Sequence, residues 1–241
     1  MKLLALDSSS KALSVALVDD KTILGEVTLN LKKNHSTTLM TAIDFLMAQS
    51  EMAPNSIDRI VVAQGPGSYT GLRLAATVGK TLAYTLNKDI VGVSSLLSIA
   101  SRIKTKDALV VPVMDARRGN AYAAVYQNGR ALVPDQHCLF SEFLADMSKK
   151  ITDFNLVIFT GETGNFIEDI KAAGFQDEQI LTDSLVVLPS AYDLALIGAK
   201  LDIVPAHGFA PHYLKKVEAE EKWLETHEEA ENAASGYVQR I

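Results

Sequence analysis

The pattern of apolar and polar positions predicts β-strands at the start of the chain. A continuous apolar run over residues 2–6 predicts a buried strand that ends on Asp7. Apolar residues then alternate with smaller or polar ones over residues 13–17, and a similar segment returns at residues 22–29 after an acidic turn. The pattern indicates three strands in an antiparallel meander, with Asp7 on the first hairpin.

Two helices are expected next, and both have apolar side chains on more than one side. In residues 35–49 most apolar side chains share about half a turn, but Phe45 lies opposite them. The segment 72–86 is apolar all round and contains small residues that allow close packing: Ala75, Ala76, Gly79 and Ala83. A helix apolar on all sides must be covered on all sides. The sheet covers one face, and either a second protein or another part of this chain covers the other.

The sequence suggests an internal duplication. A shift of 108 residues places Asp7 on Asp115, and each aspartate is followed by a second strand, a helix and a further strand. Two such halves resemble the layout of actin, sugar kinases and the Hsp70 ATPase. We therefore expect an α/β protein with two actin-like (ASKHA, ribonuclease H-like) halves with mixed sheets, residues 1–103 and 104–214, followed by an acidic helical tail, residues 215–241. The alternative is a chance match of two common hairpins.

Composition and charge narrow the classes of function. The 241 residues are 48% hydrophobic, which is ample for a core, and no stretch is long and apolar enough to cross a bilayer. The start of the chain becomes charged too early for a signal peptide, so we expect a cytoplasmic protein. The net charge of −6 argues against a protein that binds nucleic acid without the help of a partner protein. The single cysteine, Cys138, excludes an internal disulfide, and the five histidines form no helical metal-binding pair.

The glycine-rich stretch from Gln64 to Arg73 lies between a predicted strand and a helix. Its glycines and proline predict a tight turn that leaves main-chain N–H groups and the Ser68 and Thr70 hydroxyls free at a helix N-terminus, a suitable place for an anion. The glycine spacing does not match the dinucleotide-binding fingerprint, which would need a glycine at Thr70. Gly79-Lys80-Thr81 resembles the end of a phosphate-binding loop, but it lies within the predicted helix and is not one. The alternative is a turn that only packs the helix on the sheet.

The same stretch identifies a family. Gly65 to Arg73, Gly-Pro-Gly-Ser-Tyr-Thr-Gly-Leu-Arg, closely resembles the signature of the bacterial TsaB (YeaZ) family, with Tyr69 where phenylalanine is commoner. Shorter matches are Asp7-Ser8-Ser9, Asn34-His35-Ser36, Asp115-Ala116-Arg117-Arg118-Gly119, Pro211-His212-Tyr213-Leu214 and Glu218-Ala219-Glu220. Lys215 and Lys216 depart from the family's arginines. Since lysine lacks the two-pronged guanidinium, an anion clamp there is in doubt.

The resemblance implies an accessory subunit and not an enzyme. In this family the partner is a TsaD-type subunit that transfers threonylcarbamoyl to an adenosine beside the anticodon of tRNAs, with a TsaE-type ATPase as a third member. The tRNA would be met only through the complex. The chain would hold no cofactor or metal of its own, although ATP or ADP is expected at the junction of the complex. A homodimer is expected when the chain is alone.

The resemblance also implies site residues. In this family the helices that begin near His35 and Thr70 pair with those of the partner, so we expect partner-facing residues among Leu39, Ile43, Phe45, Ala76, Gly79, Lys80 and Ala83. A nucleotide-proximal loop is expected to include Asp7, Ser8, Gly65, Gly67, Ser68, Thr70, Gly71 and Arg73. The residues leave two alternatives open. Asp7 and Asp115 favour a stand-alone ATPase or kinase of this superfamily, but the phosphate-binding hairpins are missing. A glycopeptidase-type hydrolase lacks its histidine pair.

Overall fold

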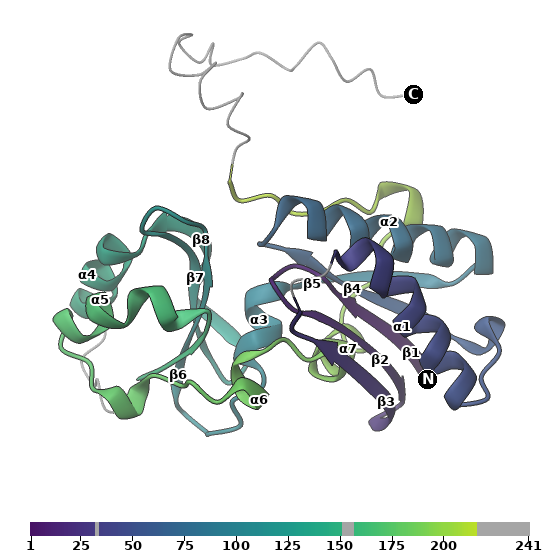
Figure 1. Cartoon of the computed structure of the whole chain (residues 1–241), viewed down its shortest axis with the longest axis horizontal. Helices are drawn as coiled ribbons and strands as arrows, with labels where there is room; N and C mark the ends of the chain where they lie inside the picture. The colour runs from purple at the N-terminus through teal and green to yellow at the C-terminus, as the bar shows by residue number, and fades with distance from the viewer. Residues whose placement is uncertain (32–33, 151–156, 216–241) are drawn as a thin grey trace, which may run out of the picture.

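The computed structural model describes residues 1–31, 34–150 and 157–215, which form two units side by side (Figure 1). The first unit contains a five-stranded sheet in the order β3-β2-β1-β4-β5, in which β1 pairs antiparallel with β2 and parallel with β4. Its strands are β1 (Lys2–Asp7), β2 (Leu13–Asp19), β3 (Thr22–Leu29), β4 (Arg59–Gly65) and β5 (Asp89–Ser94). The predicted meander is therefore confirmed, with the third strand in the predicted place.

The second unit repeats the first sheet with one strand fewer. Its order is β8-β7-β6-β9, and β6 pairs antiparallel with β7 and parallel with β9, as β1 does with β2 and β4. The strands are β6 (Leu109–Asp115), β7 (Asn120–Gln127), β8 (Arg130–Leu139) and β9 (Val157–Gly161). Asp7 and Asp115 end the equivalent strands β1 and β6. The duplication predicted from the sequence is confirmed, as are two mixed sheets in an α/β protein.

Helices cover both faces of the first sheet. On one face, α1 (His35–Gln49) and α2 (Tyr69–Leu86) pack on Leu4, Leu6 and the apolar residues of β2 and β4. The predicted second helix begins at Tyr69, three residues early, because the Ser68 side chain caps it. The other face is covered by α7 (Ala191–Gly198).

The second sheet packs on α4 (Phe140–Lys150) and α5 (Ile167–Ala172) through a phenylalanine-rich core. The remaining elements are α3 (Ser95–Ala100), α6 (Ser184–Val187) and the 3-10 helices η1 (Pro54–Ser56), η3 (Thr163–Phe166), η4 (Asp177–Gln179) and η5 (Ala206–Gly208). Among the helices of the described residues, none has the length and apolarity to span a bilayer.

The predicted second half, residues 104–214, needs a correction. From Ser190 onward the chain lies on the first unit: Leu194 and Ala195 of α7 pack on the β1 and β4 residues that face away from α1 and α2. The Val204 N–H then donates to the Ile90 carbonyl oxygen at 3.0 Å. The reason is physical, since the second face of the first sheet is apolar and no earlier helix covers it. Residues 216–241, most of the predicted tail, lie outside the described residues.

Candidate functional site

Three segments that are far apart in the sequence meet at one end of the first sheet. They are the turn after β1 (residues 7–10), the glycine-rich loop before α2 (residues 65–68) and residues 210–214, which run beside the loop. The His212 N–H donates to the Gln64 carbonyl oxygen at 2.7 Å and so fixes the last segment to the end of β4. Each segment belongs to one of the predicted family motifs.

The glycine-rich loop and the turn after β1 touch backbone to backbone. A Cβ atom on Gly67 would lie 2.3 Å from the Ser9 carbonyl oxygen, and one on Gly71 would lie 1.9 Å from the Ser8 carbonyl oxygen. The Ser68 N–H donates to the Ser9 carbonyl at 2.7 Å, and the Ser8 hydroxyl donates to the Gly71 carbonyl at 2.7 Å. These glycines are needed because side chains would separate the two loops. The packing alternative therefore accounts for them.

The rest of the loop shapes the start of α2. Gly65 has a φ of 126°, which favours glycine, and its Cβ would lie 2.3 Å from the His212 carbonyl oxygen. The Ser68 hydroxyl accepts a long hydrogen bond of 3.4 Å from the Gly71 N–H, while Thr70 is exposed. Ser68 and Thr70 thus lie on the surface at the helix N-terminus, as predicted, but the Ser68 N–H is already used.

Arg73 and Tyr213 come from two different family motifs and contact each other. The Arg73 Nε donates to the Tyr213 hydroxyl at 3.1 Å, and the guanidinium lies over the Tyr69 ring with Cζ 4.1 Å from the ring centre. The Tyr69 and Tyr213 rings lie 4.8 Å apart. Sequence reasoning missed this cluster, because nothing in either motif indicates a contact across 140 residues. The cluster fixes residues 210–214 to the first turn of α2.

Asp7 is fully buried in the turn after β1. Its Oδ1 accepts hydrogen bonds from the Ser9 N–H at 2.9 Å and from the Ser9 hydroxyl at 2.7 Å, whereas its Oδ2 has no partner among the described residues. Burial raises the pKa of Asp7, and the bonds from Ser9 and the charge of His35 lower it less. A carboxyl group with one satisfied and one unsatisfied oxygen costs stability.

Asp115, the counterpart of Asp7, has partners on both oxygens. Its Oδ1 accepts from the Arg117 N–H at 2.7 Å, and its Oδ2 accepts from the Asn165 side chain at 2.8 Å. The Asp115 N–H in turn donates to the Glu162 carboxylate at 3.0 Å. Sequence reasoning missed that Glu162 and Asn165 reach Asp115. The duplication indicates only that the strands before them are neighbours, since β6 and β9 pair as β1 and β4 do.

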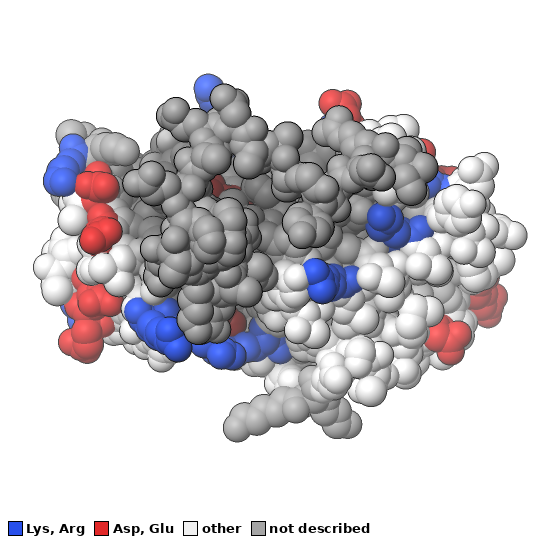
Figure 2. Space-filling model, turned by 90° about the horizontal axis from the view of Figure 1, so that it is seen from above, with Lys and Arg blue, Asp and Glu red and all other residues white. Residues whose placement is uncertain are grey.

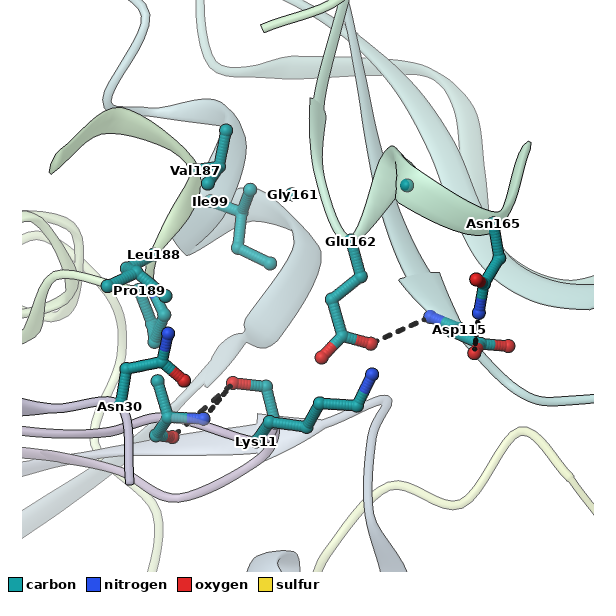
Figure 3. A pocket seen from close by; sticks show the side chains of 13 residues that line it. Lys11, Asn30, Ile99, Asp115, Gly161, Glu162, Asn165, Val187, Leu188 and Pro189 are labelled. Carbon is teal, nitrogen blue, oxygen red and sulfur yellow. Dashed lines mark hydrogen bonds between the residues drawn. The ribbon is translucent and has the colours of Figure 1, made fainter. Parts of the chain in front are cut away.

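A cleft of about 230 Å³ separates the two aspartate turns. It is lined on one side by Ser10, Lys11 and Ala12, between β1 and β2, and on the other by Asp115, Glu162 and Asn165. Figure 3 shows the Lys11 and Glu162 side chains pointing toward each other across the cleft, with Val187 and its neighbours closing another side. The cleft lies where the two halves of the duplication face each other.

Four main-chain donors beside this cleft are satisfied by side chains of the chain itself. The Ala12 N–H donates to the Ser10 hydroxyl at 3.2 Å, and the Ser9 and Arg117 N–H groups donate to the two aspartates. The Asp115 N–H is taken by Glu162. A phosphate would therefore meet occupied donors and two acidic side chains, and Lys11 is the single cation among the described residues that line the cleft. The arrangement does not favour phosphate binding.

The predicted partner-facing residues divide into buried and exposed ones. Five are buried in the core of this chain: Leu39, Ile43, Ala76, Gly79 and Ala83. A Cβ on Gly79 would lie 2.6 Å from Val62 Cγ2, so this glycine faces the sheet. The prediction for these five is corrected, because they form the sheet-facing sides of α1 and α2. Phe45 is 53% exposed, and Lys80 is half-buried with its amine donating to the His207 carbonyl at 3.1 Å.

Of the predicted residues, Phe45 alone is among the exposed large apolar residues of the two described helices. On α1 they are Met40 and Phe45, and on α2 they are Tyr69 and Tyr84, which is 81% exposed. Part of the second face of α2 is covered by this chain, since Ala206 and Phe209 pack against it. The alternative in which another part of this chain covers α2 therefore applies to that part of the helix.

Comparison with known proteins identifies the family. The family model described as TsaD, tRNA N6-adenosine threonylcarbamoyltransferase, matches residues 22–223. A Bacillus subtilis protein named tRNA threonylcarbamoyladenosine biosynthesis protein TsaB is 36% identical over 230 residues, which cover 94% of this chain and 99% of that protein. The chain belongs to the TsaB (YeaZ) family.

Other relatives agree with this membership of the TsaB family. The Escherichia coli protein of the same name is 26% identical over 83% of this chain and 87% of its own length. The structure called YeaZ from Pseudomonas aeruginosa has a TM-score of 0.71 and 25% identity, and the match covers 88% of this chain and 99% of that one. An activator of 2-hydroxyisocaproyl-CoA dehydratase from Clostridium difficile shares the fold, with a TM-score of 0.50, 13% identity and coverage of 82% and 94%.

Proposed function

We propose that this TsaB-family chain is a non-catalytic accessory subunit that a TsaD-type transferase needs to form N6-threonylcarbamoyladenosine next to the anticodon of tRNAs. The main support is the cleft between the two halves, where the chain's own side chains occupy four main-chain donors and the carboxylates of Asp115 and Glu162 line the wall. The names of its relatives supply the pathway. The cytoplasm is the expected location.

The proposed partner surface is the outer side of α1 and α2. Met40 is 49% exposed and Phe45 is 53% exposed, and α2 adds the exposed Thr77 and Tyr84. Large apolar side chains on adjacent helices favour packing against the helices of another protein. The same surface would allow a homodimer when the chain is alone, which light scattering of the purified chain tests.

The remaining members of the complex follow from the same proposal. A TsaE-type ATPase would act as the third protein, tRNA would bind through the assembled complex, and ATP or ADP would bind at the junction near Ser68, Thr70 and Arg73. These three side chains are exposed at the start of α2. If replacing Ser68 and Thr70 by alanine changes neither assembly nor its nucleotide dependence, the loop is only a structural turn.

The deciding experiment is a reconstitution of the reaction. Incorporation of threonine into unmodified tRNA is measured with a TsaD-type subunit, a TsaE-type ATPase and a source of threonylcarbamoyl-AMP, with and without this chain. We expect incorporation to require the chain. Equal incorporation without it would refute the accessory role, and ATP turnover by the lone chain would favour an independent ATPase.

Variants of the surface test where the partner binds. Phe45→Glu places a charge on the proposed interface and should abolish binding to the TsaD-type subunit while the chain remains folded, because Phe45 is 53% exposed. Leu132→Glu is the matched control, since Leu132 is 52% exposed on β8 of the other unit. Gly79→Arg is unsuitable, because Gly79 packs against Val62 and the variant would disturb the core.

A further inference from the structure

The exposed side of α2 carries no acidic residue as far as Lys88, and Asp89 lies just beyond it, beside Tyr84 and Lys88. From Tyr69 to Lys88 the chain contains no aspartate or glutamate, and residues 205–215, which run beside α2, contain none either. The same two segments contain Arg73, Lys80, Lys88 and Lys215. In a chain with a net charge of −6 this is a local excess of positive charge. Figure 2 shows the molecule from this side. The residues drawn in white and blue are uncharged or basic, and the acidic residues, in red, lie mainly toward the rim.

None of these four cations forms an ion pair with another described residue. Arg73 donates to the Tyr213 hydroxyl and Lys80 donates to the His207 carbonyl oxygen, and both acceptors are neutral. The surface also includes an exposed aromatic side chain, since Tyr84 on the last turn of α2 is 81% exposed. An acidic segment that also has apolar side chains is the ligand that fits.

The chain itself contains such a segment directly after the described residues. Residues 216–231 hold seven glutamates and two lysines, a net charge of −5, together with Trp223 and Leu224. The described chain ends at Lys215, two residues after Tyr213, whose ring lies 4.8 Å from that of Tyr69, the first residue of α2. The segment is therefore tethered beside the surface it complements, at a high effective concentration.

We propose that residues 216–231 bind along the exposed side of α2. The length is sufficient: α2 is about 27 Å long, and sixteen residues span about 24 Å even in helical form. The first glutamates would lie near Arg73 and the positive N-terminal end of α2, and Trp223 and Leu224 would cover apolar positions farther along. The binding does not depend on the proposed function. If that function is correct, the segment covers a partner-binding helix, and assembly must displace it.

Trp223 makes the proposal measurable, because it is the single tryptophan of the chain. Acrylamide quenching of its fluorescence is compared between the full chain and the peptide 216–241 in the same low-salt buffer. We expect the quenching constant of the full chain to be lower by about twofold or more, since a tethered segment is mostly bound. Salt at about 1 M should raise it toward the peptide value, because charges are then screened beyond about 3 Å.

Two variants test whether residues 216–231 bind at α2. Lys80→Glu with Lys88→Glu reverses the charge on α2 and should expose Trp223 to quenching as salt does. Arg130→Glu is the control, because Arg130 is an exposed cation on β8 of the other unit. Circular dichroism checks that both variants are folded. If the double variant does not fold, the salt dependence of quenching in the unmodified chain tests the proposal instead.

Three results would overturn the proposal. One is a quenching constant in the full chain equal to that of the peptide. Another is protection that neither salt nor the double variant removes, which would mean a site elsewhere. The third is protection that disappears on dilution, which would mean that the segment binds a second copy of the chain. None of these measurements involves the partner, so failure here leaves the accessory role standing, and failure of the reconstitution leaves this proposal standing.

Discussion

The two aspartates that end β1 and β6 occupy equivalent positions but have different surroundings. Both oxygens of Asp115 are hydrogen-bonded, whereas Asp7 has a buried Oδ2 without a partner among the described residues. Burial raises the pKa of Asp7 in the folded chain above the value of about 3.9 expected in the unfolded chain. The folded state therefore keeps this proton longer, so stability falls as the pH rises from about 4 through the folded pKa.

Replacing Asp7 by asparagine should stabilise the protein at neutral pH. The amide oxygen of the new side chain would keep the bonds from Ser9, and no buried charge would form. We expect a gain of about 1–3 kcal/mol at a pH of about 7.5 that shrinks toward about pH 4, measured by urea unfolding at both pH values. The control is Asp115→Asn, which should destabilise because two amide groups would then face each other at Asn165. A D7N variant that is less stable than the parent chain at neutral pH would contradict this account.

At the scale of single residues, the sequence indicated positions better than contacts. The duplication placed Asp7 and Asp115 on equivalent turns, and the sheet topology confirms it. The duplication indicates that β6 and β9 are neighbours, but the sequence does not show which side chains reach Asp115 or that Arg73 meets Tyr213, because such contacts depend on how distant segments pack. Local patterns contain no information on that packing.

The glycine-rich loop shows what governs the junction between β4 and α2. The close contacts of Gly67 and Gly71 with the turn after β1 hold α2 against the sheet, so the loop positions the helix whatever else it binds. The string of residues identified the family, but it could not distinguish a backbone contact from an anion site. The distinction requires the position of Ser8 and Ser9.

Adding one methyl group at Gly71 should therefore be costly. Its Cβ would lie 1.9 Å from the Ser8 carbonyl oxygen, so Gly71→Ala must move backbone, and we expect a loss of about 1–3 kcal/mol despite the better helix propensity of alanine. Gly164→Ala is the control: nothing lies within 4 Å of its Cβ position, and the change should stay within about 0.5 kcal/mol. Thermal unfolding of both variants is the measurement. If Gly71→Ala is as stable as Gly164→Ala, the loop can shift to accommodate the methyl group at little cost.

The helices show a limit of periodicity. The pattern gave the bounds of α1 correctly, but α2 is not apolar all round, since Arg73, Thr77 and Thr81 are exposed on it. The predicted contact residues Leu39, Ile43 and Ala76 face the sheet. When a helix has apolar residues on two sides, either side could pack on the sheet. The sequence pattern does not indicate which one does. The exposed Met40 and Tyr84 become evident only when the sheet is present.

At the scale of the whole molecule, two units with separate cores are joined by α3. Leu96, Ile99 and Ala100 of this helix pack on Tyr122, Tyr126 and other residues of the second sheet. A polar contact lies at the edge of this cluster, where the Ser94 and Tyr126 hydroxyls both donate to the Asp135 carboxylate. Burial is the main cause that raises the pKa of Tyr126, and the nearby Asp135 adds to it. The phenol therefore keeps its proton and donates throughout the neutral range.

Removing the Asp135 carboxylate should weaken the connection between the two units. Asp135→Ala leaves two partly buried hydroxyls without their acceptor, and we expect a loss of about 1–3 kcal/mol together with a broader unfolding transition, as the two cores lose their coupling. Calorimetry measures both effects. The control is Asp177→Ala, which removes a surface pair with Lys171 and should change stability by less than about 1 kcal/mol. If Asp135→Ala unfolds with the wild-type midpoint and sharpness, then the apolar packing of α3 couples the units and the carboxylate is dispensable.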